Sequence, residues 1–145
     1  MSEDVKEKYK IDKFNLDEEV NRQVDLMDEI GEKHAFLEGN KEATKLQLDI
    51  LKAELDNEIR QEYSQSKITE KRIENLIIMD PVYQKKYKEY LKWKKEASIA
   101  GNEKEMAMQR RAFLKLLGEL WIASYYGDPE IKEVEETKNI RGRRK

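Results

Sequence analysis

The chain has 145 residues, of which 41% are charged and 38% are hydrophobic, and its formal net charge at pH 7 is −2. Only six glycines and two prolines are available for turns, which excludes a protein built from many strands. The sequence contains no cysteine, which excludes disulfide bonds and thiolate chemistry and favours a reducing compartment.

This composition is typical of long helices that each bury one stripe of side chains. We therefore expect an all-α protein, an elongated helical hairpin or bundle with a coiled-coil-like seam that forms homo-oligomers. Residues 1–14 alternate lysine with acidic residues and have little to bury, so we expect a flexible arm. Residues 15–127 then form a single helical domain, and residues 128–145 form a polar tail with a basic end.

The sequence also predicts where the protein is located. The longest apolar run, Leu76 to Met79, has four residues, whereas a membrane-spanning helix needs roughly 20. The N-terminus lacks the apolar core of a signal peptide. We therefore expect a soluble protein that has no membrane partner and is located in the cytoplasm. For a phage-encoded protein this would be the cytoplasm of the host.

The first predicted helix begins after Asn15, a favourable N-cap, and continues to about Tyr63. Gly39 and Asn40 mark a point where this helix either breaks or bends, and our prediction is a nearly continuous helix. Along it, apolar residues recur at intervals of three and four, which is the pattern of a coiled-coil seam. The seam residues are Met27, Ile30, Leu37, Leu48, Leu51 and Leu55. Whether they pack within one chain or between subunits stays open.

A short helix is predicted next, with Thr69 as its N-cap. It carries the apolar run from Leu76 to Met79, which we expect to be buried on most sides. Asp80 and Pro81 end this helix and begin another, because aspartate caps a helix well and proline suits the first helical position.

The second half of the chain is predicted to contain two further helices. The first covers residues 81–100, and Gly101 and Asn102 predict a corner after it. The last helix covers residues 103–126 and ends at the sequence Gly-Asp-Pro that follows.

Charge is distributed unevenly between the two halves of the chain. Residues 14–63 hold 14 acidic and 6 basic residues, a balance of −8, whereas residues 64–126 hold 8 acidic and 13 basic residues, a balance of +5. Two uses of this asymmetry are open: a polyanion binds the basic half, or two copies pair acidic half against basic half.

The stretch YQKKYKEYLKWKK, residues 83–95, combines four aromatic rings with six lysines. On a helix its tyrosines share one face, which predicts that they pack inward. Lysines line the opposite face, where ammonium groups can follow a phosphate backbone while exposed rings stack on unpaired bases. These lysines are Lys85, Lys88, Lys92 and Lys95, with Trp93 on one flank. Contact with single-stranded nucleic acid and a merely solvated face are both compatible with this pattern.

Arg110 interrupts the apolar stripe of the last predicted helix. One interpretation is that its stem packs while its guanidinium either reaches solvent or pairs with an acid on a neighbouring helix, and the other is that Arg110 and Arg111 contact a phosphate. The terminal sequence RGRRK is open to the same two kinds of interpretation, as a solvated tail or as a flexible clamp on nucleic acid.

The sequence lacks the groups that an enzyme needs. The stretch LEGNKEAT does not have the glycine spacing of a phosphate-binding loop, and one histidine without cysteine makes a nucleophilic triad improbable. His34 has a glycine, Gly31, where a helical di-metal site requires a glutamate. We therefore expect no enzymatic activity, no cofactor and no metal.

The order of these parts resembles small helical phage recombination mediators of the UvsY type. The resemblance rests on the long first helix ending in LKAELDNEIRQEY, the segment KITEKRIENLIIMDP, the lysine-rich aromatic helix and the closing segment RRAFLKLLGELW. It covers roughly residues 44–126. It implies a non-enzymatic homo-oligomer that binds single-stranded DNA and works with a recombinase or a single-strand-binding protein. Lys85, Lys88, Lys92 and Lys95 would be its DNA contacts, with Arg110 and Arg111 as lesser candidates.

Two functions therefore stay open. The first is a DNA-binding accessory protein of recombination or replication, whose affinity should fall when lysines of the 85–95 segment become glutamate. The second is a structural helical adaptor or assembly protein that acts through protein–protein contacts. An adaptor should ignore those changes and fail instead when Tyr87 or Tyr90 becomes alanine.

Overall fold

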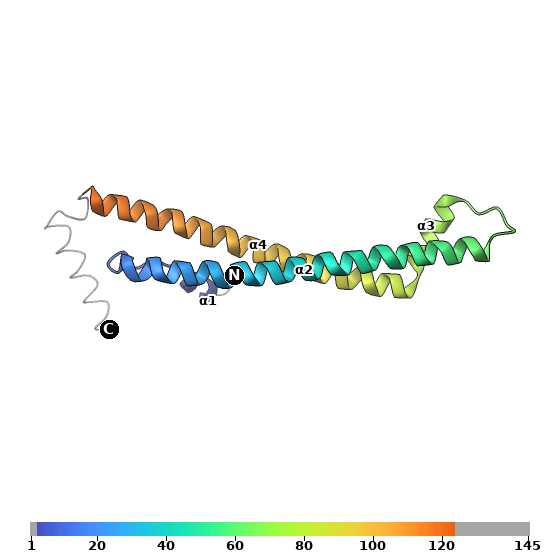
Figure 1. Cartoon of the computed structure of the whole chain (residues 1–145), viewed down its shortest axis with the longest axis horizontal. Coiled ribbons are helices and arrows are strands. Elements are labelled where there is room, and N and C mark those ends of the chain that lie inside the picture. Colours follow the sequence, from blue (N-terminus) through green and yellow to red (C-terminus); the bar gives the residue numbers. More distant parts are fainter. Residues whose placement is uncertain (1–2, 124–145) are drawn as a thin grey trace. The chain divides into compact units, whose positions relative to one another are not determined.

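The computed structural model describes residues 3–123, which contain four helices and no strand (Figure 1). The helices are α1 (Glu3–Lys8), α2 (Leu16–Glu62), α3 (Glu70–Met79) and α4 (Pro81–Ile122). The prediction of an all-α protein is confirmed for this part of the chain. The predicted helix end near Tyr126, the polar tail 128–145 and the RGRRK sequence lie outside the described residues.

The long helix α2 confirms the prediction of a nearly continuous first helix, because it runs through Gly39 and Asn40 without a break. Asn15 occupies the N-cap position, and its carbonyl oxygen accepts a hydrogen bond from the Glu19 N–H at 3.0 Å. Within the predicted flexible arm, the structure places α1 and then a turn in which the Phe14 N–H donates to the Asp12 carboxylate at 3.1 Å. The flexibility of the arm stays a prediction.

The starts of α3 and α4 are each set by a capping side chain, as the sequence predicted. The Thr69 hydroxyl accepts a hydrogen bond from the Arg72 N–H at 3.2 Å. The Asp80 carboxylate accepts from the N–H groups of Val82 and Tyr83 at 2.9 and 3.0 Å, and Pro81 is the first residue of α4. Each cap satisfies helix donors that would otherwise lack a partner.

The predicted corner at Gly101 and Asn102 is wrong, because α4 continues through both residues as one helix. A glycine costs a helix about 1 kcal/mol relative to alanine, which packing can offset. At Gly101 the packing partner is His34, since a Cβ atom added to the glycine would lie 3.6 Å from its Nε2. Gly101 therefore marks a close approach between helices.

The prediction that residues 76–79 are buried on most sides is also wrong. Ile73 and Ile77 are buried one turn apart, whereas Ile78 and Met79 are exposed. The reason is geometric, because successive helical residues point about 100° apart and this short helix buries a single face.

The chain divides into two compact units. We call residues 1–28 and 105–145 the terminal unit, and residues 29–104 the middle unit. In each unit α2 and α4 pack together in antiparallel directions. Gln23 bonds to Ala107 in the terminal unit, and in the middle unit Lys33 pairs with Glu103 and Lys86 bonds to Gln47.

The predicted seam of α2 packs inside the chain. Ile30, Leu37 and Leu48 are buried, and Met27, Leu51 and Leu55 are partly buried. In the middle unit Leu37 forms a core cluster with Ala97 and Ala100 of α4. The seam prediction thus identified residues that pack within one chain, and oligomer formation through it has no support in this arrangement.

Candidate functional site

The lysine-rich segment lies on α4 in the middle unit. Its four predicted contact residues, Lys85, Lys88, Lys92 and Lys95, are all exposed and are separated by three, four and three residues. These spacings place them along one face of the helix, and we call them the lysine row. Within residues 3–123, none of the four takes part in an ion pair.

A neighbouring lysine shows how the lysine row differs from other lysines in the unit. Lys86 is only partly exposed, and its ammonium group lies 3.1 Å from the Glu89 carboxylate and 3.1 Å from the Gln47 side-chain oxygen. Lys86 therefore uses Glu89, one of the two carboxylates that adjoin the lysine row in sequence, and the other, Glu96, forms no ion pair with the lysine row. The positive charge of the lysine row is left without a counter-charge among the described residues, which favours an anionic ligand.

The tyrosines of the segment form a line of rings along α4. The ring centroids of Tyr83 and Tyr87 are 6.2 Å apart in a stacked arrangement, and those of Tyr87 and Tyr90 are 6.3 Å apart. Tyr83 and Tyr90 are partly buried, but Tyr87 is 43% exposed. The expected inward tyrosine face is thus only partly formed, and one ring reaches the surface.

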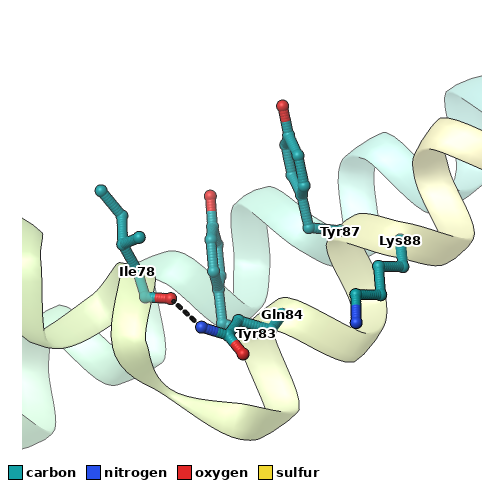
Figure 2. Close-up of a pocket in the computed structure, with 5 residues that line it drawn as sticks. All are labelled: Ile78, Tyr83, Gln84, Tyr87 and Lys88. Atoms are coloured by element: carbon teal, nitrogen blue, oxygen red, sulfur yellow. Dashed lines mark hydrogen bonds between the residues drawn. The ribbon is translucent and has the colours of Figure 1, made fainter.

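A shallow pocket opens beside these rings, with a volume of about 410 Å³. Figure 2 shows the Tyr83 and Tyr87 rings pointing the same way, while Lys88 points away from them. The Gln84 side chain donates a hydrogen bond to the Ile78 carbonyl at 3.1 Å and fixes the junction of α3 and α4 at the pocket edge. The pocket is lined by a flat aromatic surface that a planar group could contact.

Trp93 contacts both the core of the middle unit and a lysine of the lysine row. It is partly buried and packs against the cluster of Leu37, Ala97 and Ala100. The Lys92 ammonium group lies 5.5 Å from the centre of its ring. Tyr87 is the more exposed of the two rings, and a stacking role for Trp93 stays a prediction.

Arg110 belongs to the terminal unit and is buried, with only 2% of its surface exposed. Its guanidinium pairs with the Glu19 carboxylate and donates to the Gln23 side-chain oxygen at 2.6 Å. The Gln23 amide in turn donates to the Ala107 carbonyl at 2.7 Å. Of the two interpretations of Arg110, pairing with an acid on a neighbouring helix agrees with this arrangement, and contact with a phosphate does not. Arg111 is exposed.

This buried polar layer was not identified from the sequence. Glu19, Gln23, Leu26 and Ile30 are separated by four, three and four residues, so the seam spacing continues into polar positions and could have revealed it. Burial lowers the pKa of the Arg110 guanidinium and the Arg22 charge lowers it further, whereas Glu19 raises it. Arginine remains protonated in proteins, so the layer contains a buried ion pair.

His34 lies one helical turn before Glu38 on α2. Its Nε2 lies 3.8 Å from the Glu38 carboxylate, and no group of three metal-ligating side chains occurs within residues 3–123. A hydrogen bond from Lys41 lowers the pKa of Glu38, and the same bond raises the pKa of Lys41.

None of the described helices is long and apolar enough to span a membrane.

Comparisons with known proteins identify no family for this chain. The chain matches no protein-family model, and no curated protein or solved structure is detectably similar to it.

Proposed function

We propose that this chain is a non-enzymatic accessory protein that binds single-stranded DNA through the lysine row. The observation that carries the proposal is the set of four exposed lysines on one face of α4, none of them in an ion pair with another described residue. A strand can gain four charge contacts there without breaking an ion pair among the described residues.

The geometry of the lysine row suits a flexible strand. A helix rises about 1.5 Å per residue, so successive lysines lie roughly 4.5–6 Å apart along the axis. Each long side chain can adjust to the phosphate it meets, and the contact carries no sequence preference. Tyr87 supports a preference for single strands, because an exposed ring stacks on unpaired bases and each such contact contributes about 1–3 kcal/mol.

The biological setting of the proposal comes from the resemblance to phage recombination mediators. A protein of that kind is a homo-oligomer that acts beside a recombinase or a single-strand-binding protein. This chain would then bring such partners to DNA, and it would need no catalytic group.

The test is fluorescence anisotropy with a labelled single-stranded oligonucleotide and, in parallel, a duplex of the same length. We expect wild-type protein to prefer the single strand, and Lys88→Glu/Lys92→Glu to weaken binding at least tenfold because two attractive charges become repulsive. The matched control is Lys67→Glu/Lys71→Glu, which makes the same charge change at exposed positions of the middle unit outside the lysine row. Equal losses in both variants, or no binding by wild type at low salt, would contradict the proposal.

A helical adaptor is the second candidate function. The observation in its favour is that several large apolar side chains are exposed on the middle unit, among them Phe36, Leu46 and Ile50. Exposed apolar patches commonly mark contacts with other proteins. An adaptor would keep its protein partners when the lysine row is reversed, and it would lose them when its apolar contacts are removed.

A further inference from the structure

Helix α2 carries a second apolar stripe on the face that points away from its buried seam. Its members are separated by three, four, three, four and three residues, which is the spacing of a helix-packing seam. We call it the outer stripe, and it consists of Phe36, Gly39, Ala43, Leu46, Ile50 and Ala53. All six are exposed, and Phe36, Leu46 and Ile50 keep 65%, 61% and 50% of their surface open.

The outer stripe has the composition of a face on which another helix can pack. Three large side chains alternate with Gly39, Ala43 and Ala53, whose small size lets a second helix approach closely. A helix that is apolar on one face needs one neighbour, and α2 already has α4 against its seam residue Leu37. The opposite face therefore calls for a second neighbour.

The edges of the outer stripe identify the charge of that neighbour. Glu42 and Asp49 line one edge and Glu54 lies on the other, and all three are exposed. The Lys41 ammonium group lies 3.9 Å from Glu42, whereas Asp49 and Glu54 form no ion pair with another described residue. The remaining edge positions hold Asn40 and Gln47. Two outer stripes packed on each other would bring like charges together along the contact. A partner with basic edges fits better.

The same unit of this chain carries such a surface on α4. The lysine row is flanked by Tyr87 and Leu91, both exposed, so positive charges border apolar side chains there. We infer that the outer stripe of one copy docks on the lysine-row face of α4 in a second copy, with Asp49 and Glu54 facing lysines. This contact joins two different surfaces, so it leaves one of each free on every pair and can continue to further copies.

One consequence concerns the ligand of the lysine row. A second copy and a strand of DNA would occupy the same lysines, so each would displace the other. The inference itself depends only on the charges and the exposed apolar side chains of the middle unit, and it does not require the proposed function.

The test uses charge reversal on each surface and then a mixture of the two variants. Sedimentation velocity of the full chain should show mass above the 17.3 kDa monomer that rises with concentration and falls with salt. Asp49→Lys/Glu54→Lys and Lys88→Glu/Lys92→Glu should each remain monomeric alone. Mixed in equal amounts they should associate again, because each surface then meets a partner of opposite charge.

Three outcomes would contradict the proposed contact between the outer stripe and the lysine row. A wild-type chain that stays monomeric at every concentration would overturn the inference, as would a mixture that fails to associate. Stronger association of Asp49→Lys/Glu54→Lys than of wild type would show that the contact does not use the lysine row. Leu46→Gln/Ile50→Gln, which changes only exposed side chains, should also abolish association, while DNA binding by these outer-stripe variants reports on the lysine row separately.

Discussion

The two units join α2 to α4 in different ways. In the terminal unit the helices meet through a buried polar layer of Glu19, Gln23 and Arg110. In the middle unit they meet through Leu37 against two small residues, Ala97 and Ala100. The two interfaces belong to the same pair of helices, so the contrast lies in the side chains and not in the fold.

The two interfaces contribute differently to the stability and to the alignment of α2 and α4. Burial of apolar surface in the middle unit is favourable and non-directional, and it stabilises any alignment that covers the side chains. A buried ion pair is weak evidence for stability, because desolvation of the charges offsets most of their attraction. The Arg110 Nε is also buried without a hydrogen-bond partner among the described residues. We propose that the polar layer fixes which residues of α2 and α4 face each other.

The largest expected effect comes from breaking the polar layer on one side. Arg110→Ala removes the buried cation of the Glu19 carboxylate, which then keeps only the more exposed Arg22 at 3.1 Å, and the free energy of unfolding should fall by about 3–5 kcal/mol. Urea denaturation followed by circular dichroism measures this change. The matched control replaces the whole layer, Glu19→Leu/Gln23→Leu/Arg110→Met, and should be as stable as wild type or more so. A control as unstable as Arg110→Ala would show that the layer itself stabilises the fold.

The next effect breaks the apolar interface. Leu37→Ala removes a buried side chain from the cluster with Ala97 and Ala100, and we expect the free energy of unfolding to fall by about 2–4 kcal/mol. Phe36→Ala is the control, because it truncates a side chain at the adjacent but exposed position. Equal losses in the two variants would mean that the cluster is not the core of the middle unit.

The smallest expected change in the free energy of unfolding concerns the middle-unit interface, where Gly101 lies close to His34. Gly101→Ala should raise the free energy of unfolding by about 0.5–1 kcal/mol, because alanine favours the helix and its Cβ would meet His34 at an ordinary contact distance of 3.6 Å. Gly31→Ala, where an added Cβ meets nothing within 4 Å, measures the helix preference alone. A loss of stability confined to Gly101→Ala would show that this contact requires glycine.

Much of the helix layout could be predicted from the sequence, because capping is local. Thr69, Asp80 and Pro81 each act within a few residues of their own position, and the structure confirms all three. The seam of α2 was also visible, since three-and-four spacing records which face of a helix is apolar.

The errors share a physical cause, which is that burial depends on residues far apart in the chain. The polar partners of Arg110 lie 87 and 91 residues away, so the sequence left its pairing undecided between an acid and a phosphate. Trp93, which the helix wheel placed on the lysine flank, also packs against the core cluster of the middle unit, and its role in binding stays a prediction. The corner predicted at Gly101 followed from glycine's local preference, which packing against His34 overrides.

The outer stripe is the opposite case. Its regular spacing is present in the sequence, but only the exposure of its side chains shows that this face is not part of the core. Its spacing from Phe36 to Ala53 is as regular as that of the buried seam. Only the exposure of its side chains distinguishes this face, which has no partner among residues 3–123, from a buried core.

The most direct test of the central claim is the salt dependence of binding to a single-stranded oligonucleotide. If the lysine row neutralises four phosphates, the logarithm of the affinity should fall against the logarithm of salt concentration with a slope of about −3. Lys88→Glu/Lys92→Glu should reduce the steepness of that slope by about half, and Lys67→Glu/Lys71→Glu should leave it unchanged. An unchanged slope in the lysine-row variant would show that the phosphates are bound elsewhere and would contradict the account.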